Sequence, residues 1–355
     1  KGFNSEIKIS EIEIEFLYEL ILLRISISIL KSSLNEKYNS DNRYLQVSKD
    51  DMLLIFDKWA DIDKELATYF FRNACGFTPN PNEKKFKKLI SKKRSSIDVL
   101  FNKNETNKLE NLDLSVSSKW LSSDLINDIK SFEKKINQKP LSTFFGGYLE
   151  NRAVYDSSDY EVLTERGFEN RTTHLGVDFW VNEKTSINSI EDGIIKIITN
   201  DKTSKGYGGL IIIEHNLGSL KFYSLYGHLT DQSKSKIKVG DFVEKGEKIA
   251  EIGSVKENGG WSPHLHFQIM LTILDYKNDF PGVCLESEKK VWSSICPNPN
   301  LILNIDVNTN TKFDEDKLKI SREKYLPRNL KLSYNSPIYI VPVSYTHLRA
   351  HETDR

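Results

Sequence analysis

Two histidines separated by a single residue, His264 and His266, constrain this chain more than any other feature. They lie in the segment Ser262-Pro-His-Leu-His-Phe-Gln-Ile269, which is typical of a β-strand. Residues two apart on a strand point to the same face, so both imidazoles are expected to project side by side. One of them can then bind a metal while the other stands over it.

A second polar pair lies upstream, where His174 and Asp178 enclose the residues Leu-Gly-Val. Their even spacing places both side chains on one face if the backbone is extended. Together the two pairs supply two imidazoles, one carboxylate and a spare imidazole. This inventory predicts a catalytic zinc site, in which three protein ligands leave a fourth position to water.

Composition limits the classes of partner. The chain has 355 residues, of which 50 are basic, 50 are acidic and 38% are hydrophobic. This is enough for a buried core and for two or three domains, and the charge balance gives no electrostatic case for nucleic acid.

The most apolar early run, 16–30, is interrupted by charged residues and serines, which favours a packed helix over a membrane span. Three widely spaced cysteines without a C-x-x-C pair fit a reducing compartment, so we expect a cytoplasmic protein. The sequence opens with Lys1 rather than Met, which leaves an export signal open as the alternative.

The character of the chain changes twice along its length. Apolar residues recur at helical spacing within 1–80, which predicts two or three helices that end near Gly76. Residues 81–139 are rich in Lys, Ser, Asn and Asp and predict a polar linker. Short apolar runs bounded by glycine then predict an antiparallel β domain at 140–304, so the predicted fold class is α+β, mainly antiparallel β after a helical segment. Four of these runs lie at 193–198, 209–215, 220–226 and 248–253.

Five motifs follow one another between about residues 165 and 270. They are His174-Leu-Gly-Val-Asp178, Gly206-Tyr-Gly208, Tyr226-Gly-His228-Leu, the glycine-containing segment from Lys238 to Gly246, and Pro263-His-Leu-His-Phe267. In this order they resemble the lysostaphin-type (LytM-like) zinc metallopeptidases. Residues 257–263, Glu-Asn-Gly-Gly-Trp-Ser-Pro, depart from the small Thr/Gly/Ser turn that is commoner in that family.

The resemblance implies a role for each polar residue of these motifs. His174, Asp178 and His266 would bind Zn²⁺, while His228 and His264 would be the catalytic histidines. A histidine beside a metal-activated water can take its proton or steady the oxyanion, and the sequence leaves open which of the two does which. The implied activity is hydrolysis of an amide bond in a peptidoglycan-like or glycine-containing peptide. The alternative is a non-catalytic β module that binds a ligand or scaffolds neighbouring enzymes.

The flanking segments resemble other families. Residues 1–80, through Asn42-Arg-Tyr-Leu45, resemble the last helices of an aminoglycoside-phosphotransferase-like kinase, and residues 321–341, within a connector at 305–344, resemble the lead-in to a class III aminotransferase. This implies an internal fragment of a kinase, peptidase and aminotransferase protein. Neither a kinase catalytic loop nor a pyridoxal-phosphate lysine context is visible, so those activities are not expected here. Residues 345–355 resemble a translated sequencing adaptor and are expected to be non-native.

Overall fold

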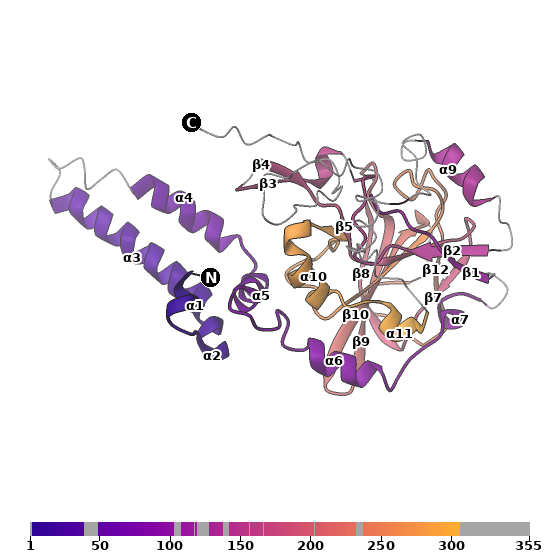
Figure 1. Cartoon of the computed structure of the whole chain (residues 1–355), viewed down its shortest axis with the longest axis horizontal. Coiled ribbons are helices and arrows are strands. Elements are labelled where there is room, and N and C mark those ends of the chain that lie inside the picture. Colours follow the sequence, from indigo (N-terminus) through magenta and orange to yellow (C-terminus); the bar gives the residue numbers. More distant parts are fainter. Residues whose placement is uncertain are drawn as a thin grey trace, which may run out of the picture.

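A computed structural model describes residues 2–38, 49–102, 108–116, 118, 128–137, 142–155, 157–165, 167–201, 203–231 and 237–305. Within this part of the chain, helices come first and a large sheet follows (Figure 1). The predicted α+β class is therefore confirmed. None of the helices among these residues has the length and apolarity that a membrane span requires.

An eight-stranded sheet forms the centre of the molecule. Its strands are β1 (Lys108–Asn111), β2 (Ser142–Gly146), β6 (Val177–Trp180), β8 (Gly193–Asp201), β9 (Gly208–Leu217), β10 (Leu220–Leu229), β11 (Phe242–Val243) and β13 (Leu265–Met270). Their order is β1-β2-β6-β13-β10-β9-β8-β11, and only the pairing of β1 with β2 is parallel. The mainly antiparallel sheet predicted after the helical segment is therefore present.

Three small strand pairs accompany this sheet. They are β12 (Lys248–Glu251) with β7 (Ser186–Asn188), β14 (Val283–Cys284) with β5 (Thr173–His174), and β3 (Glu161–Thr164) with β4 (Gly167–Asn170). All four strands predicted from apolar runs are found, as β8, β9, β10 and β12. The short elements η2 (Ser158–Tyr160), η4 (Glu286–Glu288) and α11 (Asn300–Leu303) lie in the connections.

Alternation along the strands divides the sheet into two faces. In β13, Leu265, Phe267 and Ile269 point into the larger hydrophobic core. His266 and Gln268 are also buried, and their positions between these residues turn them toward the opposite face. The strand therefore uses one face for packing and the other for polar groups.

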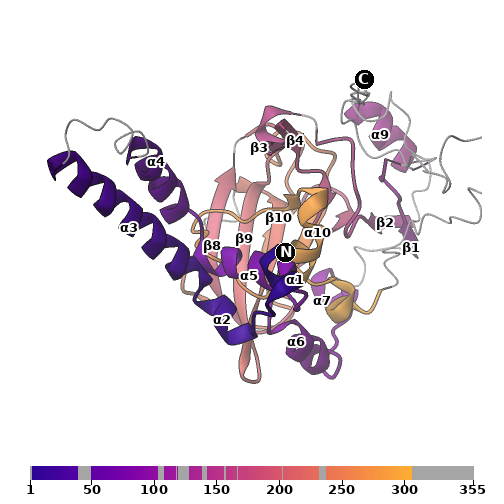
Figure 2. The ribbon, with the colours of Figure 1, turned by 60° about the vertical axis from the view of Figure 1, so that its left-hand side comes forward.

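The first five helices among the described residues are α1 (Gly2–Glu6), α2 (Glu11–Glu15), α3 (Leu17–Tyr38), α4 (Lys49–Ala60) and α5 (Lys64–Ala74). A capping box between Ser10 and Glu13 starts α2. The chain leaves α5 through Gly76, whose φ of 89° suits glycine, so the predicted helix stop is confirmed. The α3–α4 hairpin extends away from the sheet (Figures 1 and 2), whereas α5 packs against α10 (Lys289–Ile295).

One face of the helical hairpin is apolar and exposed. In and just before α3, the exposed large apolar residues are Ile12, Phe16, Leu20, Leu23, Ile27, Leu30, Leu34 and Tyr38. From Phe16 to Leu34 they are spaced alternately four and three residues apart, which is the period of one helix face. A protein surface usually carries single, scattered apolar residues, whereas these side chains form one continuous row.

Residues 81–139 differ from the expected polar linker. Their described part forms α6 (Glu83–Ile90), α7 (Ile97–Leu100), β1 and α9 (Ile129–Ile136). Phe86 packs on Phe222 and Phe101 packs on Phe179, each with ring centroids 5.6 Å apart, and both Phe86 and Phe101 are fully buried. The lysines between these apolar residues dominate the composition, which hides the helical spacing of the few that reach the core.

The proposed domain boundaries stay predictions. Residues 42–45 and all residues after Ile305 lie outside the described part of the chain. The kinase-like and aminotransferase-like resemblances, the connector at 305–344 and the non-native tail at 345–355 are therefore not tested by the structure.

Candidate metal centre

The register of the sheet brings two of the predicted ligands together. His266 on β13 pairs directly with Asp178 on β6, so the two side chains are cross-strand neighbours. His174 arrives from a different strand pair, because β5 ends at His174 and β6 begins only at Val177. The backbone between His174 and Asp178 is therefore not extended throughout, so the condition under which their even spacing would place them on one strand face is not met. The chain bends at Gly176, where a Cβ atom would lie 2.6 Å from the imidazole of His266.

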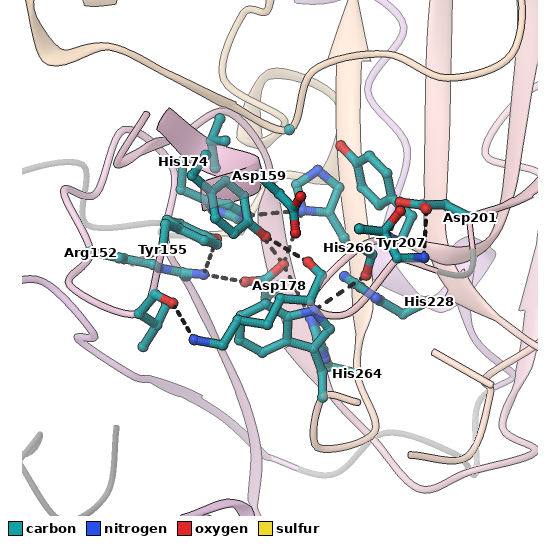
Figure 3. A pocket seen from close by; sticks show the side chains of 18 of the residues that line it. Arg152, Tyr155, Asp159, His174, Asp178, Asp201, Tyr207, His228, His264 and His266 are labelled. Carbon is teal, nitrogen blue, oxygen red and sulfur yellow. Dashed lines mark hydrogen bonds and ion pairs between the residues drawn. The ribbon is translucent and has the colours of Figure 1, made fainter. Parts of the chain in front are cut away.

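Three ligand atoms converge at this point, one from each of His174, Asp178 and His266 (Figure 3). His174 Nε2 lies 2.8 Å from His266 Nδ1 and 3.4 Å from Asp178 Oδ1, and His266 Nδ1 lies 3.2 Å from Asp178 Oδ1. Ligand atoms about 2.0–2.1 Å from a tetrahedral zinc ion are roughly 3.3 Å apart. The donor set and its spacing therefore fit a zinc ion, and all three side chains are buried.

Hydrogen bonds fix which nitrogen of each imidazole is free. His174 Nδ1 lies 2.9 Å from the carbonyl oxygen of Gly147, which can only accept, so Nδ1 carries the proton and Nε2 keeps its lone pair. His266 Nε2 lies 3.0 Å from Gln268 Oε1, while the amide nitrogen of Gln268 donates to Pro281 O. His266 Nδ1 is therefore the free nitrogen. Partners of this kind orient the ligands of metal sites.

Asp178 is held by a buried arginine. Its Oδ2 atom accepts a hydrogen bond from Arg152 Nη1 at 2.6 Å, which leaves Oδ1 facing the imidazoles. Burial raises the pKa of Asp178, but His174 and Arg152 outweigh this effect and hold that pKa well below its usual value. The carboxylate is therefore ionised at neutral pH, as a metal ligand must be.

The two remaining predicted histidines lie beside this triad. His264 precedes β13 and its Nε2 lies 3.9 Å from Asp178 Oδ1. His228 lies near the end of β10, where the register shifts, and its φ of 66° is unusual for a residue other than glycine. The two rings are 4.2 Å apart between centroids. The structure therefore gathers all five sequence-predicted site residues in one place.

Both of these histidines also have a defined tautomer. His264 Nδ1 donates to Ser262 O at 2.7 Å and His228 Nδ1 donates to Asn258 O at 3.0 Å, so each keeps a free Nε2. Burial lowers the pKa of His264, and burial together with the neighbouring His264 lowers the pKa of His228 well below its ordinary value. Burial and the charge of Arg152 lower the pKa of His174 to about 4. These three imidazoles are neutral at pH 7.

The loop that departs from the family pattern contributes directly to the site. The side chain of Asn258 accepts hydrogen bonds from the backbone of Gly260 and Trp261 and donates to Trp261 O at 2.9 Å. These hydrogen bonds close the loop, and the backbone carbonyl oxygen of Asn258 accepts the hydrogen bond from His228 Nδ1. Trp261 lies edge-on to both His228 and His264.

These residues line a cavity of about 380 Å³, which is the size of a small-ligand site. Sequence reasoning missed most of its walls. Tyr207 stood inside a recognised motif, but nothing in the sequence pointed to Arg152, Tyr155 or Trp180. Trp180 stacks on His264, and the hydroxyl of Tyr207 is buried without a hydrogen-bond partner among the described residues. The aromatic residues that line the cavity are Phe132, Tyr155, Tyr160, Trp180, Tyr207, Trp261 and Phe280.

Comparisons with known proteins find similarity over the part of the chain that carries these five residues. The model of peptidase family M23 matches residues 172–277. The glycyl-glycine endopeptidase ALE-1 of Staphylococcus capitis is 41% identical over 103 residues, which are 28% of this chain and 25% of that protein. Lysostaphin of Staphylococcus staphylolyticus is 33% identical over 132 residues, which are 36% of this chain and 25% of that protein.

The chain spans about a quarter of the length of these curated relatives. A solved catalytic domain of lysostaphin from Staphylococcus simulans is 30% identical, and the match covers 32% of this chain and 74% of that chain. Its TM-score of 0.24 is too low to support a conclusion about the fold.

Proposed function

We propose that residues 172–277, which match the model of peptidase family M23, act as a zinc-dependent hydrolase of peptide amide bonds. The observation that carries the proposal is the convergence of three metal-binding atoms beneath two imidazoles with free Nε2 atoms. A purely structural metal site has four protein ligands, whereas this one has three and opens into a cavity.

The metal would be held by His174 Nε2, Asp178 Oδ1 and His266 Nδ1. When bound, zinc supplies a Lewis acid that polarises a carbonyl group and lowers the pKa of water to about 7. Two neutral imidazoles and one carboxylate leave the site with a net charge of about +1, which preserves this Lewis acidity.

His264 and His228 would transfer protons and stabilise the charge that develops on the amide during hydrolysis. We assign the role of base to His264, because its free Nε2 lies 3.9 Å from a ligand atom and is therefore beside the reacting centre. Once protonated, it can return the proton to the leaving amine. The hydroxyl of Tyr207 faces the same cavity and would donate a hydrogen bond to the negative oxygen that develops on the amide carbonyl. His228, whose Nε2 carries no proton at rest, would donate to that oxygen once Nε2 is protonated.

The proposed substrate is a peptide that contains glycine, of the kind found in peptidoglycan. Its support is the similarity to a protein named as a glycyl-glycine endopeptidase. The cavity is walled by aromatic rings close to both spare histidines, which suits a backbone with small side chains at the scissile bond. The cytoplasmic location stays a prediction, and a cytoplasmic protein would meet a small glycine-containing amide rather than the cell wall.

Two measurements on the purified chain test this function. Elemental analysis should find one zinc ion per chain, and the protein should release amines from pentaglycine faster than from a pentaalanine control. Asp178→Ala removes the anionic ligand and should abolish both zinc binding and cleavage. Full zinc in that variant would overturn the ligand assignment, while a zinc-loaded wild type that cleaves no peptide of the panel would favour the non-catalytic module.

A further inference from the structure

Each of the three proposed ligands is supported by one neighbouring group. Gln268 orients His266 from within the region that matches the peptidase family. The other two supports, the carbonyl of Gly147 on His174 and the guanidinium of Arg152 on Asp178, come from residues that precede the match. The metal centre is therefore completed by a segment that the family match does not include.

Arg152 holds two carboxylates at once. Its Nε donates to Glu150 Oε2 at 2.7 Å and its Nη1 donates to Asp178 Oδ2 at 2.6 Å, and the arginine is only 3% exposed. Glu150 in turn accepts the backbone N–H of Leu114 at its other oxygen, at 3.1 Å. Both oxygens of Glu150 are thus acceptors, as expected of an ionised carboxylate.

The surroundings of Arg152 are built to admit it. The guanidinium lies against Gly147, whose φ is 104°, and a Cβ atom there would overlap Arg152 Nη2. That Nη2 group is buried and has no acceptor among the described residues. A buried cation with an unpaired donor costs folding free energy, so global stability alone is a poor explanation for its presence.

We propose that Arg152 is a positioning residue for the metal centre, which fixes the rotamer of Asp178 so that Oδ1 alone faces the metal while Glu150 neutralises the arginine. The inference deepens the proposed function and rests on it only in that the site binds zinc. Lysine cannot replace the arginine fully, because one ammonium group lacks the planar fork that reaches two carboxylates in fixed directions.

The test is the zinc affinity of the full chain, measured by competition with a chelator. Arg152→Met should weaken zinc binding about 10- to 100-fold, the usual effect of losing a group that orients a ligand. Arg152→Lys should lose less, because the charge remains. Arg171→Met is the matched control, since Arg171 lines the same cavity but donates to Asp159 O and contacts none of the ligands. Its zinc affinity should stay at the wild-type value.

A spectroscopic measurement separates positioning from general damage to the fold. In Co²⁺-loaded protein, the visible d–d bands should shift in Arg152→Lys and stay unchanged in Arg171→Met. If Arg152→Met does not fold, Arg152→Lys decides the matter. Wild-type zinc affinity with an unchanged cobalt spectrum in Arg152→Lys would overturn the proposal, as would wild-type affinity in a folded Arg152→Met.

These outcomes are distinct from failure of the proposed function. If the wild-type chain binds no zinc, the function itself fails before any variant is compared. If the wild type binds zinc and cleaves peptide while both Arg152 variants keep full affinity, only the positioning role is wrong.

Discussion

The five polar residues of the site are of two kinds. His174, Asp178 and His266 point one free atom each at a common centre, whereas His228 and His264 keep a free Nε2 beside it. An acceptor holds one ring nitrogen of every one of these histidines, so the distinction rests on where the free nitrogen lies. Metal binding and catalysis should therefore be separable by mutation.

His228→Ala and His264→Ala should keep zinc and lose activity. Loss of a general base or of an oxyanion donor typically lowers kcat by about 10²- to 10³-fold. Elemental analysis and peptide cleavage measure the two properties on the same preparation. Loss of zinc in His264→Ala would mean that ligand and catalyst are exchanged within the H-x-H pair.

His215 gives the fold a pH dependence away from the metal centre. It is fully buried, with Nδ1 donating to Asp192 O at 2.9 Å and Nε2 2.6 Å from Ser224 Oγ. Burial lowers the pKa of His215 to about 4, against about 6.5 in the unfolded chain. The unfolded state therefore binds more protons below pH 6.5, so the stability from this residue is complete above pH 6.5 and is lost as the pH falls toward 4.

We expect His215→Gln to lower the acid sensitivity of the fold. Each pKa unit is worth about 1.4 kcal/mol, so the wild type should lose about 3 kcal/mol more than the variant between pH 7 and pH 4. Urea unfolding of both proteins at several pH values measures the difference, and the other histidines are common to both. Parallel stability curves would contradict the buried neutral state of His215.

At the scale of elements, the site is a junction of strands with a preceding turn. Asp178 and His266 come from paired strands of the large sheet, His174 comes from a small separate pair, and Gly147 follows β2. The bend at Gly176 and the open space at Gly147 let these elements approach closely. The site therefore requires glycine at these two positions as well as the ligand residues.

Gly147→Ala should damage the metal centre as well as the fold. Its positive φ strains an alanine by on the order of 1–3 kcal/mol, and the added methyl would overlap Arg152. Gly167→Ala is the matched control, because Gly167 has nearly the same φ, 103°, and open space around the position of the added methyl. Thermal unfolding should show a loss in both variants, while zinc affinity should fall only in Gly147→Ala. Equal zinc affinities would show that the turn does not support the site.

For the whole molecule, the packing of residues 63–101 decides where the folded unit starts. Asp63 accepts the backbone N–H of Asp275, Asn80 donates its backbone N–H to Ser294, and Tyr69 belongs to the core that includes α10. The segment that follows adds buried side chains to the opposite core. These contacts favour a unit that begins before α5 rather than at residue 140.

A chain of residues 62–305 should therefore fold and bind zinc, whereas residues 140–305 should not fold stably. The shorter chain loses Phe86, Ile90, Leu100 and Phe101, which are fully buried. At roughly 1.5–3 kcal/mol for each large side chain, their loss costs about 6–12 kcal/mol, which is comparable to the whole stability of a domain. Urea unfolding and zinc content compare the two chains, and a stable, zinc-binding 140–305 would restore the boundary predicted from composition.

The polar groups of the site and the class of fold could be predicted from local patterns along the chain. His174, Asp178, His228, His264 and His266 stand in short motifs, and strand alternation and helical spacing are local properties of neighbouring residues. Such patterns are visible without any knowledge of distant contacts. They were sufficient to single out the five polar residues that the fold gathers and to predict helices before a mainly antiparallel sheet.

The residues that surround those groups could not be predicted in this way. Arg152 and Trp180 reach the site through pairing of strands and turns far apart in the chain, and Phe86 and Phe101 lie in a stretch whose charged neighbours conceal them. The bend between His174 and Asp178 and the close approach of the His266 ring to Gly176 are likewise visible only in the folded chain. These contacts depend on which distant segments pack together, and the local periodicity of a sequence does not show this.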